Sequence, residues 1–241
     1  MLNQLSLSKY DLTEENISSF DERTLLVKKW NWDYQLALDF QQECVRLLQE
    51  SGNQRVLIAC NHPNVFTNGR GLQKAKKGQT LELVDFNPAM SSLLPFPVHQ
   101  ITRGGGLTFH HPGQYIFYPI VKLNPKTLSL SKMMDDIFDS ARITLESWGI
   151  DGLTSENELL GLWRGKNKLA SMGIAIERLT TFHGMALNMF KNDEMKNAMR
   201  TLNPCGLNPE TYLSVEELTP LDKNALEDFH TEFIKRLKHA W

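Results

Sequence analysis

The sequence predicts an α+β fold, and three observations lead to that prediction. Strand-like runs rich in aliphatic and aromatic residues follow one another at 98–123 and again at 159–190. Long stretches with a helical spacing of apolar residues lie before, between and after those runs. No glycine-rich turn opens a helix, which argues against a P-loop and a Rossmann fingerprint. Adjacent strands combined with a few long helices favour an α+β arrangement over regular βαβ winding.

The elements of the first half follow from these patterns in chain order. Apolar positions 37, 40, 44, 47 and 48 share one face, which predicts a helix over 33–50 that ends at Ser51 and Gly52. Cys44 lies on that face, so we interpret it as a core side chain. Strands are predicted at 55–60, 98–103, 107–110 and 115–123.

In the second half, Ser131 is predicted to cap a helix that runs to Trp148, with Gly149 just past its end. A helix over 226–237 closes the chain, after strands at 159–163, 169–177 and 181–190. Prolines at positions 88, 95 and 97 make 87–97 an irregular connection. Neither a repeat nor a long linker interrupts the sequence, so we expect a single domain over 1–241.

Composition and charge limit the class of protein. A chain of 241 residues, 41% of them hydrophobic, is long enough to bury a full core. Its net charge of −2 creates no overall field that would attract nucleic acid or an anionic membrane. Residues 1–10 lack the pattern of a signal peptide, and no stretch approaches the roughly 18 apolar residues of a membrane span. We therefore expect a cytoplasmic protein without nucleic-acid or membrane partners.

Local features are more informative than the average composition. Positive charge gathers in the glycine-flanked segment 69–78, which either lies in solvent or meets an acidic partner; its basic residues are Arg70, Lys74, Lys76 and Lys77. The three cysteines are widely spaced, which favours reduced thiols over a disulfide framework. Cys60 and His62 are one residue apart, but no second pair stands at a known zinc-ligand spacing. We expect no metal site, and we interpret Cys60 as the buried end of a strand.

The segment 103–114 is the most suggestive part of the chain, because it places three glycines, an arginine and two histidines between predicted strands. Consecutive glycines let the main chain come close to a ligand and direct several N–H groups at one point. This segment therefore predicts one wall of a binding site.

Cys205 is the candidate nucleophile, since it lies between Pro204 and Gly206 in a polar turn where a thiol is accessible. A thiol reacts as its thiolate, which a nearby cation stabilises, and Lys168 and His183 are the candidate neighbours. A partly buried Lys168 at the head of an apolar strand would also exchange protons near neutrality. Structural alternatives remain open: Lys168 as a solvated charge at a sheet edge, Cys205 as a turn residue and His183 as a hydrogen-bonded core histidine.

Four groups of residues, in this order along the chain, resemble the successive motifs of the lipoyl(octanoyl) transferases, a family related to lipoate and biotin protein ligases. They are Arg103-Gly104-Gly105 with Thr108-Phe109-His110, Pro112-Gly113-Gln114 and Tyr118-Pro119; Gly165 with Lys168-Leu169-Ala170-Ser171-Met172-Gly173; His183-Gly184-Met185-Ala186-Leu187-Asn188; and Asn203-Pro204-Cys205-Gly206. His62-Pro63, Val65-Phe66-Thr67 and Gly69-Arg70 are similar to the family's first strand and turn. The resemblance covers about 55–210 and leaves outside it an N-terminal extension, 1–54, and a C-terminal helix, 222–241.

The resemblance implies a mixed β-sheet flanked by helices and an octanoyltransferase activity. The donor would be octanoyl-acyl carrier protein, and the acceptors would be lysines on the lipoyl domains of 2-oxoacid dehydrogenase E2 subunits and on the glycine cleavage H protein. Cys205 would carry the acyl group as a thioester, with Lys168 as its acid/base partner. The substrate-binding residues would be Arg70, Arg103, Gly104, Gly105, Gly106, Thr108, His110, Ser171, Met172, Gly173, His183, Gly184 and Met185.

The resemblance implies no ATP and no other cofactor, because a thioester donor is already activated; we also expect a monomer. His111 departs from the family pattern, which usually has glycine there, so this side chain is expected either to narrow the pocket or to restrict the turn. Three alternatives stay open. They are an amidotransferase that moves octanoyl or lipoyl groups between protein lysines, a binding protein that has kept the pocket but lost turnover, and a thiol hydrolase.

Overall fold

The computed structural model describes residues 5–51, 54–70, 91–92, 94–156, 160–194, 197 and 211–240. Cys205 and the basic residues Lys74, Lys76 and Lys77 lie outside the described residues, as do residues 87–90 and 93 of the predicted connection 87–97. Among the residues described, no helix combines the length and the apolar content that crossing a membrane requires.

A large mixed sheet forms the centre of the described chain, in the strand order β1-β2-β3-β7-β11-β10-β9-β8. Its strands are β1 (Ile17–Asp21), β2 (Thr24–Lys29), β3 (Arg55–Cys60), β7 (Gln114–Val121), β8 (Leu153–Glu156), β9 (Gly161–Arg164), β10 (Asn167–Glu177) and β11 (Thr180–Asn188). β2 and β3 are parallel, whereas the other neighbours are antiparallel. A smaller sheet has the order β5-β4-β6, with β4 (Val65–Asn68), β5 (Val98–Gln100) and β6 (Leu107–His110).

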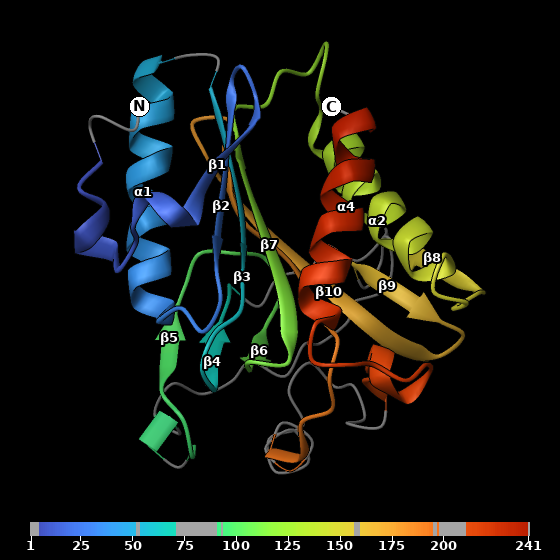
Figure 1. Ribbon diagram of the computed structural model, residues 1–241. Coiled ribbons are helices and arrows are strands. Elements are labelled where there is room, and N and C mark those ends of the chain that lie inside the picture. Colours follow the sequence, from blue (N-terminus) through green and yellow to red (C-terminus); the bar gives the residue numbers. More distant parts are fainter. Residues whose placement is uncertain are drawn as a thin grey trace, which may run out of the picture.

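The large sheet is covered on both faces, as Figure 1 shows. Helix α1 (Tyr34–Ser51) lies on one face, and α2 (Leu130–Glu146) and α4 (Ala225–Ala240) lie on the other. Short 3₁₀ turns complete the described chain at η2 (Leu7–Tyr10), η3 (Glu14–Asn16) and η7 (Val215–Glu217). This three-layer arrangement confirms the predicted α+β fold with a mixed sheet between helices.

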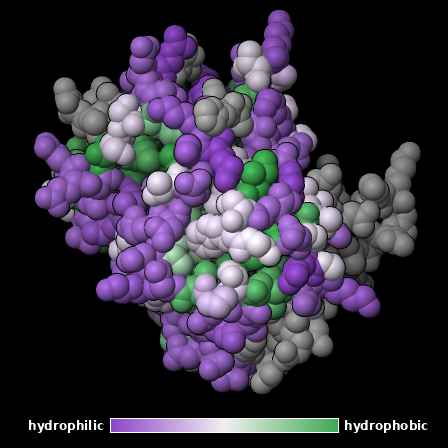
Figure 2. Space-filling model, turned by 45° about the vertical axis from the view of Figure 1, so that its right-hand side comes forward, coloured by the Kyte–Doolittle hydropathy of each residue, from purple (hydrophilic) through white to green (hydrophobic). Residues whose placement is uncertain are grey.

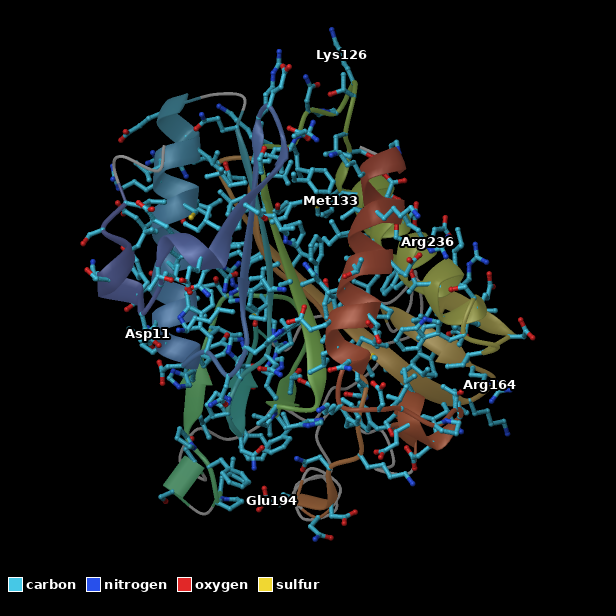
Figure 3. The ribbon with its side chains drawn as sticks, viewed as in Figure 1. Asp11, Lys126, Met133, Arg164, Glu194 and Arg236 are labelled. Carbon is cyan, nitrogen blue, oxygen red and sulfur yellow. The ribbon has the colours of Figure 1, made fainter. Side chains whose placement is uncertain are left out.

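The core lies in two layers because side chains alternate along each strand. On β7, Tyr115 and Phe117 pack with α2 and α4, while Ile116 and Tyr118 belong to the layer under α1. Figure 3 shows Met133 pointing from α2 into the first of these layers, where it is completely buried. The face in Figure 2 is mostly hydrophilic, with smaller hydrophobic areas between the polar side chains. Burial on both faces explains why β3 and β7 are continuous apolar runs.

Two predictions about element boundaries are wrong for local reasons. The cap of α2 is Ser129, whose Oγ accepts the N–H of Lys132 at 3.2 Å, and Ser131 instead lies in the first turn. The strand predicted over 98–103 stops at Gln100, because its partner β4 ends at Asn68, whose carbonyl accepts the N–H of Ile101 at 2.9 Å. The chain then turns so that Arg103 becomes buried, which starts the loop that forms the site.

Candidate active site

One pocket lies between the small sheet and the large sheet, and its free space, counted out to the open mouth, is about 960 Å³. Its walls are formed by Tyr34, the segment 103–110, Gln114, Tyr118, Leu160, Lys168, Ser171, Met172, Gly173, His183, Gly184, Met185, Ala186, Asn188 and Tyr212. The pocket therefore brings together the expected site residues in the described chain, with the exception of Arg70. The side chain of Arg70 is exposed, although its N–H donates to the carbonyl of Arg103 at 3.1 Å.

Arg103 shapes the glycine-rich loop from inside. Its side chain is buried, and Nη1 donates to the carbonyls of Gly104 and Gly106, both at 3.0 Å. Nη2 donates to the carbonyl and the hydroxyl of Thr67, at 2.9 and 2.7 Å. The loop thus wraps around the guanidinium group, and Gly105 takes a φ of +82° that favours glycine. Arg103 both lines the pocket and fixes the main chain of its wall.

Close packing of that loop on β10 explains a second glycine of the motif. A Cβ at Gly173 would stand 2.9 Å from Cδ of Arg103 and 3.0 Å from the carbonyl oxygen of Gly104. Glycine is required here because any side chain would push the loop off the strand.

His110 is held in a buried polar network under the loop. Its Nδ1 lies 3.0 Å from Oε1 of Gln114, and its Nε2 lies 3.3 Å from the hydroxyl of Thr67. Gln114 in turn donates from Nε2 to Oδ1 of Asn188 at 2.9 Å. Burial holds the pKa of His110 well below its usual value, so the ring is neutral at physiological pH. The network presents a polar but uncharged floor to the pocket.

His183 has an unusual backbone and an unsatisfied side chain. Its φ is +58° in the middle of β11, and its N–H donates to Oε1 of Gln41 at 2.8 Å instead of continuing the ladder. Nε2 is buried and has no hydrogen-bond partner among the described residues. Burial and the charge of Arg103 lower the pKa of His183 to about 3. This imidazole lines the pocket, and its Nε2 is not bonded to any described residue, which argues against the alternative of a hydrogen-bonded core histidine.

Lys168 is buried on β10, which overturns the alternative of a solvated charge at a sheet edge. Its side chain lines the pocket, and only 6% of the residue is exposed. Its carbonyl accepts the N–H of Leu213 at 3.0 Å, and Lys168 and Tyr212 form an isolated parallel β-bridge. The segment that follows position 210 is therefore docked on the strand that carries Lys168.

His111 lies outside the pocket wall and belongs to the turn that follows β6. Its Nδ1 accepts the N–H of Gly113 at 3.1 Å, and its ring stacks on Phe109 with an interplanar angle of 21°. Burial lowers the pKa of His111 to about 4. Of the two expected effects of this departure, the structure places the side chain where it restricts the turn.

Cys60 and His62 form a buried pair with structural partners. Sγ of Cys60 lies 3.7 Å from Nε2 of His62, which also contacts the hydroxyl of Tyr118 at 2.9 Å. Nδ1 of His62 lies 2.7 Å from the carbonyl of Trp32. Across the described part of the chain, no group of three or more His, Cys, Asp or Glu residues is arranged to hold a metal ion. Cys60 and Cys44 are both buried, as expected for core thiols.

Three tyrosines that line the pocket escaped sequence reasoning: Tyr34, Tyr118 and Tyr212, the last of which follows the region of the motifs. Tyr34 comes from α1 and stacks on His110 with an interplanar angle of 14°. Nothing in its sequence neighbourhood signals a site, since only the packing of α1 on the sheet brings it there. Tyr118 belongs to the first motif and to the strand predicted over 115–123, so its sequence context indicates a structural residue.

Comparison with known proteins extends beyond the motif region. The description of the matching family model is "Lipoyl protein ligase A/B catalytic domain", and it matches residues 33–238, which include α1 and most of α4. The chain is 31% identical over 189 residues to the octanoyltransferase of Caldicellulosiruptor bescii, covering 77% of this chain and 78% of that protein. It is 32% identical to the octanoyltransferase of Syntrophobacter fumaroxidans over 196 residues, which are 81% of each chain.

Solved structures support the same assignment at the level of fold. A crystal structure of lipoate-protein ligase A bound with ATP has a TM-score of 0.61 at 13% identity, with 90% of this chain and 84% of that chain covered. A putative lipoate protein ligase from T. acidophilum with bound lipoic acid has a TM-score of 0.62 at 14% identity, with the same coverage. The chain is therefore an acyltransferase that belongs to the lipoyl protein ligase A/B catalytic domain family.

Proposed function

We propose that this enzyme transfers an octanoyl group from octanoyl-acyl carrier protein to a specific lysine of lipoyl domains, with Cys205 as the residue that carries the group. The observation that supports this most strongly is the convergence of the loop 103–106, Lys168 and the strands β10 and β11 on one pocket. Relatives named octanoyltransferases, which cover most of the chain, support the choice of acyl group.

In the first step the thiolate of Cys205 attacks the carbonyl carbon of the donor thioester. The new C–S bond forms, the bond to the carrier's sulfur breaks, and the carrier leaves as a thiol after taking up a proton. The ammonium group of Lys168 stabilises the attacking thiolate and supplies that proton. Tyr212 lines the pocket and forms a β-bridge with Lys168. Cys205 precedes Tyr212 by only seven positions in the sequence, which supports the proposal that its thiol reaches the amine of Lys168.

In the second step the ε-amine of the lipoyl-domain lysine attacks the acyl-enzyme. The amide bond forms, Cys205 leaves as the thiolate, and the amine of Lys168 accepts the proton that the new amide nitrogen must lose. The enzyme returns to its starting protonation state, so no nucleotide is consumed. Each tetrahedral intermediate carries negative charge on oxygen, which fixed main-chain N–H groups stabilise.

The pocket lining is suited to an uncharged acyl chain. Apolar side chains of Leu107, Phe109, Leu160, Met172 and Met185 contribute to its walls. The histidines on its floor are neutral because burial lowers their pKa values. An aliphatic chain therefore meets no ionised imidazole in this pocket.

The proposed acceptors are the lipoyl domains of 2-oxoacid dehydrogenase E2 subunits and the glycine cleavage H protein. One structural neighbour is an archaeal lipoate protein ligase described together with its E2 lipoyl domain, at a TM-score of 0.58. The exposed Arg70 begins the basic segment 70–77, which would meet an acidic carrier or lipoyl domain in encounters that salt weakens. We propose a cytoplasmic, monomeric, single-domain enzyme that needs neither a metal ion nor a cofactor.

The proposal is tested by mass spectrometry of all three proteins after incubation of the enzyme with octanoyl-acyl carrier protein, with and without apo lipoyl domain. We expect an octanoyl adduct on the enzyme that is chased to the lipoyl domain, is absent in Cys205→Ser and is retained in the matched control Cys44→Ala. Release of free octanoate instead would indicate a hydrolase. An octanoylated H protein as the sole usable donor would indicate an amidotransferase, and binding without an adduct would indicate a binding protein.

A further inference from the structure

Lys168 and Trp163 lie opposite each other on neighbouring strands. They are Cα partners in the antiparallel pairing of β10 with β9, so their side chains share one face of the sheet. Nζ of Lys168 lies over the indole of Trp163, 5.2 Å from the ring centroid. Both residues are buried, with exposed fractions of 6% and 5%. At this distance the negative face of the ring attracts the ammonium group.

Gly161 makes this contact possible. It lies on β9 two positions before Trp163, on the same face of the strand. A Cβ added to Gly161 would stand 2.5 Å from both the carbonyl oxygen of Ala170 and Cε of Lys168, and 3.1 Å from Nε1 of Trp163. The aliphatic part of the Lys168 side chain therefore packs over Gly161, and its ammonium group lies over the indole of Trp163.

The charge states of the other residues in the pocket wall define the electrostatic surroundings of Lys168. The titratable or charged residues that share its walls are Tyr34, Arg103, His110, Tyr118, His183 and Tyr212. Burial lowers the pKa values of both histidines and raises those of Tyr34 and Tyr118, which keeps these four side chains uncharged at neutral pH. Among the described pocket residues, the basic side chains other than the neutral histidines are Arg103 and Lys168, and Arg103 donates to the loop carbonyls.

We propose that Trp163 is a positioning residue for Lys168, and that Gly161 provides the space in which the lysine side chain lies. The indole holds the ammonium at the pocket and favours its charged form, while Trp163 itself does not line the pocket. This inference depends on the proposed function only for the catalytic role of Lys168. The seat formed by Gly161 and Trp163 is a property of the folded chain.

The contact of Lys168 with Gly161 and Trp163 can be tested without any substrate. The full-length protein is labelled competitively with acetic anhydride at a series of pH values, and the labelling of the Lys168 peptide is measured by mass spectrometry. The reagent acylates the neutral amine. In Trp163→Leu we expect half-maximal labelling to move to lower pH by about one unit, because the group that stabilises the ammonium is lost. Trp163→Phe keeps an aromatic face and should stay close to the wild type. Trp148→Leu is the matched control, since Trp148 packs on Phe229 away from the pocket.

Turnover provides the second measurement. Trp163→Leu should lower kcat about tenfold with KM for the lipoyl domain within about twofold, and should move the pH–rate profile in the same direction as the labelling curve. Trp163→Met, which also lacks an aromatic ring, keeps the inference testable if Trp163→Leu does not fold, and the same shift of the labelling curve is expected.

A labelling curve for Trp163→Leu that coincides with the wild type, or one for Trp163→Phe that shifts equally, would overturn the inference. The outcome for the proposed function is separate. If Lys168→Met leaves transfer intact, the catalytic assignment is wrong whatever the labelling shows. If Lys168→Met abolishes transfer while Trp163→Leu changes neither the labelling nor kcat, only the inference fails.

Discussion

The pocket and the layer of helices α2 and α4 are both buried, but they are built in opposite ways. In the helix layer the large side chains are aromatic and tightly packed: Phe229 and Phe233 stack on each other and meet Tyr115 edge to face. The pocket instead contains a buried lysine, a buried arginine and a buried histidine nitrogen that makes no hydrogen bond to any described residue. The difference indicates that the helix layer supplies stability, whereas the pocket keeps costly polar groups for chemistry.

The largest expected effect that separates the two regions is on activity. Lys168→Met removes the acid/base group and should lower transfer by about 10²–10⁴-fold. It should not lower the free energy of unfolding, because a buried charge is replaced by an apolar chain of similar length. Single-turnover transfer and thermal unfolding of the same preparation measure both. A marked loss of stability without loss of transfer would break the comparison.

The reverse result is expected in the helix layer. Phe233→Ala removes a completely buried ring between Tyr115 and Phe117 and should cost about 3–5 kcal/mol of unfolding free energy. Activity per folded molecule should remain close to the wild type, since the residue does not line the pocket. Denaturant unfolding combined with activity corrected for the folded fraction checks this. A selective loss of turnover at full stability would argue against the division.

Acid sensitivity should come mainly from the pocket side. Burial lowers the folded-state pKa of the pocket residue His183 to about 3 and holds the pKa of His110 well below its usual value, whereas an unfolded histidine titrates near 6.5. Their stabilisation is therefore complete above about pH 6.5 and is lost as the pH falls toward the folded values, by at most about 1.4 kcal/mol per pH unit and group. His183→Asn should flatten this slope, measured by unfolding at pH 5 to 7.

His230 provides the control for that measurement. It lies in the helix layer, where burial also lowers its pKa to about 4, and its Nδ1 is 3.0 Å from the hydroxyl of Tyr115. His230→Asn should remove the contribution of one histidine to the pH dependence of the unfolding free energy and leave most of that dependence unchanged. If His230→Asn alone abolished the acid dependence, the pocket would not be its main source.

The smallest expected effect concerns the start of α2. Ser129→Ala removes the side chain that accepts the N–H of Lys132 and should cost about 1 kcal/mol of unfolding free energy, with no change in activity. Ser131 is the second residue of the helix, and Ser131→Ala should leave the free energy of unfolding nearly unchanged. Equal losses in the two variants would contradict the assignment of the cap.

The sequence predicted the central strands better than the edges of the sheet. The predictions at 55–60 and 107–110 agree with the structure residue by residue, since each is an apolar run that ends at turn residues. The edge strands β1 and β8 were not predicted, and neither was β2, which lies next to β1. Apart from Phe20 on β1 and Leu153 on β8, the residues of the two edge strands are exposed or half-buried, so neither edge strand carries a sustained alternation of apolar and polar side chains.

For the site, the motifs identified the residues that line the pocket but not how they are held. The consecutive glycines 104–106 signalled a loop that approaches a ligand, whereas the structure shows this loop wrapped around the buried guanidinium of Arg103 and packed closely on Gly173. The left-handed backbone of His183 and the indole beside Lys168 depend on contacts with α1 and β9. Such contacts join residues far apart in the sequence or across a strand pair, so no local pattern announces them.

The central claim is that the acyl group rests on the sulfur of Cys205. Its most direct test is peptide mapping of enzyme quenched during a single turnover with octanoyl-acyl carrier protein. We predict an octanoyl thioester on the peptide that contains Cys205, sensitive to hydroxylamine and lost when apo lipoyl domain is added. An octanoyl group on the peptides of Cys44 or Cys60, or transfer to the lipoyl domain at the wild-type rate by Cys205→Ser, would contradict the account.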